Sequence, residues 1–207
     1  MNTNARSDPT VDYYDRHADD FVRDTLAVDV TPLHEPFLAL LPVGGRVLDA
    51  GCGSGRDARE FKRRGFVVTA FDASPELAQR ASGVVGQPVT VMRFQEVAFN
   101  ERFDGVWACA SLLHLHRKEL GNAIRRLAAS LVVGGVFFAS FKCGDGEGER
   151  GGRYFTDFTA EGLREELSSC PLLEVLRIWE SADARPERSA EKWVNALARK
   201  RNSEGEP

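Results

Sequence analysis

The sequence predicts an α/β fold in which a mostly parallel β-sheet is covered by helices on both faces. From about residue 46 onward, short β-branched and apolar runs alternate with segments of helical periodicity. Within this pattern, V-L-D-A-G-C-G-S-G-R-D-A at 47–58 indicates a strand that ends on an acid, turns through three glycines and enters a helix. In such sheets ligands bind outside the carboxyl ends of the strands, so functional residues are expected there.

The N-terminal part of the chain predicts two amphipathic helices. Asp8-Pro9 begins the first, since Asp is a good N-cap and Pro suits the first helical position. Apolar residues then recur at helical spacing over 11–22. Thr31-Pro32 gives the same start signal for a second helix, which ends at Pro42.

The remaining elements follow in alternation. Strands are expected at 46–50, 66–71, 89–94, 103–110 and 136–141, and helices at 56–64, 74–82, 117–131 and 160–169. Two last strands, at 173–179 and 193–198, are joined by a short polar link, which is typical of an antiparallel pair. The glycine-rich, charged segment 143–153 is expected to be a mobile loop.

Composition limits the class of protein. The chain has 207 residues, of which 43% are hydrophobic and 28% charged, and this fits one globular domain over 1–207. The net charge of −4 argues against binding nucleic acid mainly through phosphates. Four cysteines without a C-x-x-C pair or nearby His predict free thiols and no metal site. With no secretory signal and no apolar run near ~20 residues, we expect a soluble cytoplasmic protein without a membrane partner.

The glycine-rich turn is a candidate site for a nucleotide-like ligand. Its spacing is G-x-G-x-G, whereas the dinucleotide fingerprint is G-x-G-x-x-G. The carboxylate of Asp49, two residues before the first glycine, would repel a pyrophosphate. Asp72 ends the next strand, 21 residues after Gly51, where an acid accepts hydrogen bonds from ribose hydroxyls. The alternative is that Asp72 only caps the following helix, although Ser74 already does so.

With these features the chain resembles the class I S-adenosylmethionine-dependent methyltransferases. The matching segments are V-L-D-A-G-C-G-S-G, F-D-A-S-P-E-L, F-D-G-V-W-A-C-A-S-L-L-H-L and G-G-V-F-F-A-S-F, within about 46–141. G-R-Y-F-T-D-F-T and W-V-N-A-L-A-R-K are similar to small bacterial members labelled tellurite-resistance-like or ubiquinone-methyltransferase-like. The resemblance implies a Rossmann-like, seven-stranded sheet in the order 3-2-1-4-5-7-6 with strand 7 antiparallel. It also implies a helical lid over about 9–42 and a cofactor-binding core over 46–200.

The resemblance implies S-adenosyl-L-methionine as the cofactor and S-adenosyl-L-homocysteine as the product. Asp49 would lie near the methionine ammonium group, contacting it directly or through water, and Asp72 would hold the ribose. Either Gln95 or Glu96 would bind the adenine amine. The other cofactor contacts that it implies are Ala50, Gly51, Cys52, Gly53, Ala73, Ala108, Cys109 and Ala110.

Three further residues are candidates for contacts to the cofactor. Tyr14 is the best candidate in the lid, and its alternative is packing within an amphipathic helix. Thr25 is the second candidate there. Arg56 either pairs with the cofactor carboxylate or is a solvated helix side chain.

The acceptor end of the site is expected just past the fourth and fifth strands. His114 is the candidate catalytic base, because an unperturbed His titrates near neutrality; its alternative is packing or capping the next helix. An Arg–aromatic cluster at 153–155 would clamp a small anionic or planar acceptor. Trp107 is assigned to the core and His116 to the surface. The predicted substrate residues are Ser111, His114, Phe141, Lys142, Arg153 and Tyr154.

The predicted function is methyl transfer to a small-molecule acceptor. The fourth strand ends in A-C-A-S-L-L-H and lacks the Asn/Asp-Pro-Pro-aromatic motif of enzymes that methylate adenine or amide nitrogens. The alternatives are a tRNA or other macromolecular methyltransferase, a non-catalytic cofactor-binding regulator, and a nicotinamide-dependent oxidoreductase. A basic ending, A-R-K-R-N, and arginines at 150–153 favour the first of these.

Overall fold

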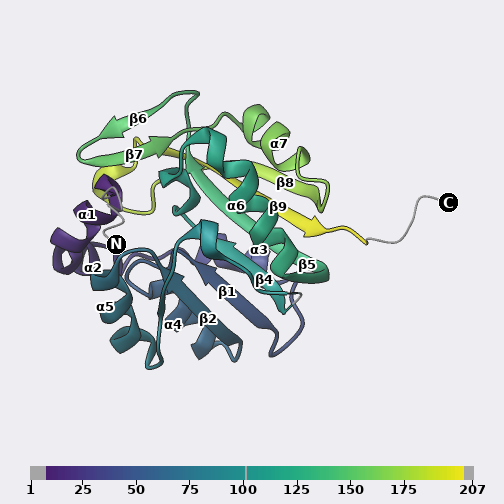
Figure 1. Ribbon diagram of the computed structural model, residues 1–207, viewed down its shortest axis with the longest axis horizontal. Coiled ribbons are helices and arrows are strands. Elements are labelled where there is room, and N and C mark those ends of the chain that lie inside the picture. The colour runs from purple at the N-terminus through teal and green to yellow at the C-terminus, as the bar shows by residue number, and fades with distance from the viewer. Residues whose placement is uncertain (1–7, 101, 203–207) are drawn as a thin grey trace, which may run out of the picture.

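A seven-stranded sheet forms the centre of the computed structural model, which describes residues 8–100 and 102–202 (Figure 1). The strand order is β3-β2-β1-β4-β5-β9-β8, and β9 is antiparallel to both of its neighbours. This confirms the predicted order and the antiparallel last strand. The strands are β1 Arg46–Ala50, β2 Val67–Asp72, β3 Thr90–Val91, β4 Phe103–Ala108, β5 Leu131–Lys142, β8 Leu173–Ala182 and β9 Lys192–Lys200.

Helices cover both faces of this sheet, as the alternating pattern predicts. Side chains of α6 and α7 pack on one face, and those of α3, α4 and α5 pack on the other. Among the described residues, no helix is long and apolar enough to cross a bilayer. The helices are α1 Pro9–Arg16, α2 Ala18–Thr25, α3 Thr31–Leu38, α4 Arg56–Arg63, α5 Pro75–Val85, α6 Arg117–Ser130 and α7 Ala160–Ser168, with short 3-10 turns η1 Phe94–Glu96, η2 Leu112–His114 and η3 Pro186–Arg188.

Neighbouring residues of the central strands point into opposite cores, because side chains alternate along a strand. Val106 and Phe137 pack beneath α6, whereas Trp107 and Phe138 pack beneath α3 and α4. The rings of Trp107 and Phe138 stack with centroids 3.9 Å apart. Trp107 is fully buried, so its assignment to the core is confirmed.

The segment predicted to be a mobile loop is instead a β-hairpin. β6, Glu147–Arg150, pairs antiparallel with β7, Arg153–Thr156. The turn between them is the glycine pair at 151–152, both with positive φ, which suits a two-residue hairpin turn. The charges that indicated a solvated loop are partly used in pairing, since Arg150 binds Asp157 at 2.6 Å.

Two other predicted elements differ from the structure. The first helix is interrupted at His17, where α1 ends and α2 begins. The third strand is only two residues long, and Phe94 already belongs to the turn η1. Asp8 caps α1 as predicted, by accepting from the backbone N–H groups of Thr10 and Val11.

The N-terminal helix α1 packs against the hairpin at one end of the sheet (Figure 1). The backbone N–H of Tyr154 donates to Thr10 Oγ1 at 3.0 Å. A Cβ at Gly152 would lie 3.0 Å from the ring of Tyr13, so the helix approaches the turn very closely. Two segments that are far apart in the sequence therefore meet above the carboxyl ends of the strands.

Candidate active site

Two adjoining cavities lie at the carboxyl ends of β1, β2, β4 and β5. The smaller has a volume of about 110 Å³ and the larger about 530 Å³. Four residues line both cavities and so mark the place where they meet: Tyr14, Phe21, Ala110 and His114. A ligand that extends from one cavity into the other must pass this junction.

The glycine turn forms one wall of the smaller cavity. Gly51 and Gly53 line it with φ of 77° and 55°, a region that favours glycine. A Cβ at Gly51 would come within 2.6 Å of the Cβ of Ser111, and one at Gly53 within 2.9 Å of Phe21. Only glycine at these two positions lets the turn approach its neighbours and leaves its backbone open to a ligand.

Asp72 connects this turn to the following helix. Its Oδ2 accepts from the N–H of Gly53 at 2.8 Å, and its Oδ1 accepts from the N–H of Ser74 at 2.9 Å. Burial raises the pKa of Asp72, although these backbone N–H groups act in the opposite direction. Ser74 also caps α5 as predicted, by accepting from the N–H of Leu77. Asp72 and its neighbour Ala73 both line the smaller cavity.

The structure separates the two candidates for the adenine contact. Gln95 lines the smaller cavity beside Phe94. Glu96 is exposed, and its Oε2 accepts from the backbone N–H of Arg93 at 2.7 Å, which closes the turn η1. Only Gln95 is therefore positioned to contact a ligand in this cavity.

Besides Glu96, four of the predicted cofactor residues line neither cavity. Asp49, Ala50 and Ala108 are buried behind the glycine turn, and Cys52 lies partly buried within it. Burial raises the pKa of Asp49 well above its usual range, and the charge of Asp57 adds to this. The Asp49 carboxyl is buried with its Oδ2 unpaired, so of the two predicted routes to the ammonium group, direct or through water, its position favours the second.

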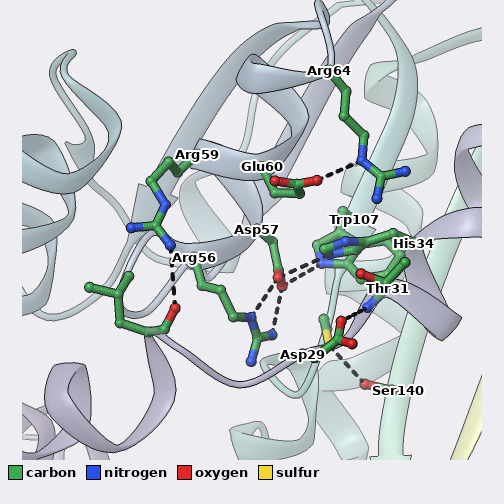
Figure 2. A network of polar contacts seen from close by, with 12 residues as sticks. Asp29, Thr31, His34, Arg56, Asp57, Arg59, Glu60, Arg64, Trp107 and Ser140 are labelled. Atoms are coloured by element: carbon green, nitrogen blue, oxygen red, sulfur yellow. Dashed lines mark hydrogen bonds and ion pairs between the residues drawn. The ribbon is translucent and has the colours of Figure 1, made fainter.

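A buried carboxylate that was not predicted, Asp57, is the centre of a polar network that includes Arg56 of the larger cavity (Figure 2). Asp57 accepts two hydrogen bonds from Arg56, at 2.7 and 2.9 Å, and one from the indole N–H of Trp107 at 2.9 Å. His34 of α3 donates from Nε2 to the same carboxylate at 3.1 Å. Burial alone would raise the pKa of Asp57, but Arg56 and His34 outweigh it and hold that pKa far below its usual range.

This network changes the interpretation of Arg56. Two of the guanidinium nitrogens, Nε and Nη2, bind Asp57, and the side chain is 20% exposed. Arg56 nevertheless lines the larger cavity, as do Thr25, Cys109 and Ala110. Thr25 donates from Oγ1 to the carbonyl of Phe21 at 2.6 Å, which fixes its side chain at the end of α2.

A chain of two hydrogen bonds crosses the junction of the cavities. His114 Nδ1 lies 2.7 Å from the carbonyl oxygen of Tyr154, and Nε2 lies 2.8 Å from the hydroxyl of Tyr14. A carbonyl oxygen only accepts, so Nδ1 carries the proton and Nε2 accepts from the Tyr14 hydroxyl. Burial lowers the pKa of His114 to about 4, and the charge of Arg153 also lowers it. The imidazole is thus neutral at pH 7, and its lone pair is engaged by Tyr14.

Acidification is expected to destabilise the fold through His114. Its folded-state pKa of about 4 lies below the ~6.5 of a His in an unfolded chain. Between these values the unfolded chain binds a proton that the folded protein does not, so the free energy of unfolding falls as the pH decreases. Between pH 7 and pH 5, urea unfolding should show a smaller decrease in the free energy of unfolding for His114→Gln than for the unsubstituted protein. The exposed neighbour His116 gives the control His116→Gln, and an equal loss in all three proteins would contradict the expectation.

The predicted substrate residues do not all reach the larger cavity. Lys142 and Arg153 line it, whereas Ser111 lines the smaller one and donates to the carbonyl of Ala50 at 2.7 Å. Phe141 is fully buried against Phe158 and belongs to the core, because its side chain points to the opposite face from those of its two neighbours in β5.

Tyr154 also differs from its predicted role. Its ring lies over His116, with centroids 3.9 Å apart, and it lines neither cavity. Only its backbone takes part in the site, through Thr10 and His114. In the hairpin, successive residues point to opposite sides, so Arg153 and Phe155 face the cavity while Tyr154 faces away.

Several residues that line the larger cavity were not among the predicted site residues. Ser140 of β5 and Asn195 of β9 are buried polar residues opposite each other in the sheet. Polar residues inside otherwise apolar strands were the available signal for both. In the described part of the chain, no group of His, Cys, Asp and Glu is arranged to hold a metal ion. The other cationic lining residues that were missed are Arg150, Arg185 and Arg188.

Residues 14–179 match the family model described as a methyltransferase domain. The chain belongs to this methyltransferase family. The prediction of a class I S-adenosylmethionine-dependent methyltransferase, with S-adenosylmethionine as its cofactor, is thereby confirmed. The match begins at Tyr14, in the last turn of α1, and therefore includes α2 and the hairpin.

Individual relatives agree with this family. The methyltransferase is 37% identical over 109 residues to a ubiquinone biosynthesis O-methyltransferase of Xanthomonas axonopodis, covering 49% of this chain and 44% of that one. It is 32% identical over 117 residues to a magnesium-protoporphyrin O-methyltransferase of Rhodobacter capsulatus, covering 51% of each. The matched regions thus span about half of these curated relatives.

A solved structure covers more of the methyltransferase. The 1,6-didemethyltoxoflavin N1-methyltransferase of Burkholderia thailandensis superposes with a TM-score of 0.74 at 27% identity. The alignment covers 93% of this chain and 87% of that chain. That structure contains bound 1,6-didemethyltoxoflavin together with S-adenosylhomocysteine.

Proposed function

We propose that this methyltransferase transfers the methyl group of S-adenosylmethionine to a small-molecule acceptor. The observation that carries the proposal is the junction at Tyr14, Ala110 and His114 between a cavity beside the glycine turn and a larger one. The adenosine end of the cofactor occupies the smaller cavity. The methyl group lies at the junction, and the acceptor approaches it from the larger cavity.

Residues of the smaller cavity take the roles that their geometry supports. Asp72 accepts the ribose hydroxyls with the lone pairs that Gly53 and Ser74 leave available. Gln95 binds the adenine edge, and Ala73 and Phe94 lie against the base. On the methionine side, the cofactor passes Thr25, Cys109 and Ala110, and the Arg56 nitrogen not used on Asp57 faces its carboxylate.

The reaction is an in-line displacement at the sulfonium methyl. A lone pair of the acceptor forms the bond to the methyl carbon, and the electron pair of the breaking C–S bond stays on sulfur. Because the sulfonium already activates the methyl, the protein mainly orients and desolvates the acceptor. A neutral His114 with its lone pair on Tyr14 suits the role of a positioning residue, and an acceptor that arrives as an anion needs no general base.

A small acceptor is supported by the walls of the larger cavity and by the relatives. Its lining includes apolar and aromatic side chains of the lid, the turn η2, the hairpin and β9, among them Phe21, Leu33, Leu113, Phe155 and Trp193. The relatives named above act on a ubiquinone precursor, magnesium-protoporphyrin and a toxoflavin precursor. All three are small molecules with flat ring systems.

The direct test is incubation with methyl-labelled S-adenosylmethionine and a metabolite extract of the host, followed by mass spectrometry. Label should appear in a product of low molecular mass, and boiled protein serves as the control. Label found only in RNA or protein, or no label despite cofactor binding, would refute a small-molecule acceptor.

Two of the arginines that favoured a tRNA substrate are engaged within the chain. Arg150 pairs with Asp157 at 2.6 Å, and Arg201 of the basic ending donates to the carbonyl of Leu173 at 2.9 Å. A gel shift with tRNA at increasing salt is therefore expected to show only weak, salt-sensitive binding. Tight binding that persists at physiological salt would favour the tRNA alternative.

His114→Ala is expected to slow turnover without weakening the binding of the cofactor. The substitution removes the group that orients the Tyr14 hydroxyl at the junction, and misplacement at a reacting centre costs roughly 10²-fold in rate. Affinity for S-adenosylhomocysteine, measured by calorimetry, should change by no more than about twofold, since the adenosine contacts remain. His116→Ala is the matched control on the same segment. An unchanged rate for His114→Ala would leave this residue a purely structural role.

A further inference from the structure

The larger cavity contains one cation that differs from its neighbours. Six cationic side chains line it, and five of them pair with carboxylates of the chain. Arg153 is the sixth, and within residues 8–100 and 102–202 it has no carboxylate partner. Its Nε is buried without a hydrogen-bond partner, and its Nη1 donates to the Tyr14 hydroxyl at 3.4 Å.

Aromatic rings hold this guanidinium at the cavity wall. Its central carbon lies 4.7 Å from the ring centroid of Tyr13 and 5.2 Å from that of Phe155. Such cation–π contacts orient an arginine but do not neutralise its charge. A partly buried cation without a counter-ion is costly, so this wall of the cavity is suited to an anionic group of a ligand.

The second unusual group lies in the sheet that forms another part of the same cavity. Asn195 is 0% exposed and lies in the middle of β9. Its Nδ2 donates to the carbonyl of Trp179 at 3.3 Å and to Ser181 Oγ at 3.0 Å. A carbonyl only accepts, so the amide nitrogen must face Trp179, and Oδ1 faces away from it. That oxygen is buried without a partner.

An orphaned acceptor of this kind calls for a donor. Buried polar atoms are nearly always hydrogen-bonded, and one left unpaired is destabilising. Five buried side-chain atoms lack a partner among the described residues, and of the five residues that carry them only Arg153 and Asn195 line this cavity. The cavity therefore has a place for an anion and a separate place for an O–H or N–H group, between aromatic walls.

Building on the proposed function, we propose that the methyl acceptor is a small, flat acid that also carries a hydrogen-bond donor. Its anionic group lies on Arg153, and its O–H or N–H group donates to Oδ1 of Asn195. Asn195 is then a specificity-determining residue, because an acid without the donor leaves Oδ1 buried and unpaired. An acceptor that lacks the anion leaves Arg153 without a counter-charge.

Calorimetric titration of the full chain, saturated with S-adenosylhomocysteine, tests this with single-ring probes. The three isomers of hydroxybenzoate carry both groups, benzoate lacks the donor, and the hydroxybenzamides lack the anion. We expect at least one hydroxybenzoate to bind about tenfold or more tightly than benzoate and than its own amide. Asn195→Leu should abolish the preference over benzoate, and Arg153→Gln should abolish the preference over the amide.

Matched controls come from the same walls of the cavity. Arg150→Gln removes a cation that also stacks on Phe155 but is paired with Asp157, and it should keep both preferences. Ser181→Ala removes a contact to Nδ2 but leaves Oδ1 unchanged, and it should keep the preference over benzoate. Binding of S-adenosylhomocysteine by each variant reports that it is folded.

The outcomes separate this inference from the proposed function. If S-adenosylhomocysteine binds but no hydroxybenzoate is preferred, or if the preferences survive Asn195→Leu and Arg153→Gln, the acceptor class is wrong while the proposed function stands. If S-adenosylhomocysteine does not bind the unsubstituted protein, the proposed function itself fails.

Discussion

Asp72→Ala is expected to weaken the binding of S-adenosylhomocysteine by more than about tenfold, because a charge-assisted, two-point contact to the ribose is lost. The substitution has a second effect. Asp72 also accepts from the backbone N–H groups of Gly53 and Ser74, so the alanine variant leaves both donors without that partner. The glycine turn then loses a contact that holds it in the ligand-ready conformation, and both losses act in the same direction.

Calorimetry with two ligands separates these effects. An analogue of S-adenosylhomocysteine without the 2′-hydroxyl should bind the unsubstituted protein more weakly but should lose little further affinity in Asp72→Ala. Glu96→Ala is the control, because Glu96 lies nearby, is exposed and closes only the turn η1. Unchanged affinity of Asp72→Ala for the intact ligand would refute the ribose assignment.

Asp57→Ala is expected to lower the free energy of unfolding by about 3–5 kcal/mol, the range for breaking a buried ion pair from one side. The variant leaves the guanidinium of Arg56 largely buried without its partner and removes the acceptor for His34 and Trp107 (Figure 2). The network joins α3, α4 and β4, so the loss should also loosen the attachment of the N-terminal helices to the sheet.

Urea unfolding at pH 7 measures this effect. Glu60→Ala is the matched control on the same helix, since Glu60 pairs with Arg63 and Arg64 at the surface and such pairs contribute about 0–1 kcal/mol. If Asp57→Ala does not yield folded protein, Asp57→Asn, which keeps the shape and one acceptor, should still unfold at lower urea than Glu60→Ala. Equal midpoints for the Asp57 and Glu60 variants would contradict a central role for the network.

The parts of the fold that sequence predicted best are those with strong local signals. The turn at 51–55 needs glycines for its own backbone, and Ser74 caps α5 through a contact three residues away. The strand order followed from the resemblance, and the antiparallel last pair also followed from a link too short for a crossover. Gly151 and Gly152 were ambiguous, because glycines and charges occur both in mobile loops and in hairpins that another element covers.

The parts that were missed depend on contacts between distant segments. Asp57 looks like an ordinary helix residue until His34 and Trp107 are brought to it from 23 and 50 residues away. Asn195 is one polar residue in an apolar strand, and its role depends on which of its atoms Trp179 uses. Tyr154 illustrates the converse, because a one-residue difference along a strand turns a side chain to the other side.

The two cavities differ in how much of the chain they need. Every residue that lines the smaller cavity lies between Asp8 and Leu115, whereas the larger one also uses residues as far along as Asn195. During synthesis, the lining of the smaller cavity is therefore complete when little more than half the chain has been made. The lining of the larger cavity is completed only when β8 and β9 emerge. Substitutions in the last third of the chain can accordingly change the larger cavity while every lining residue of the smaller one stays the same.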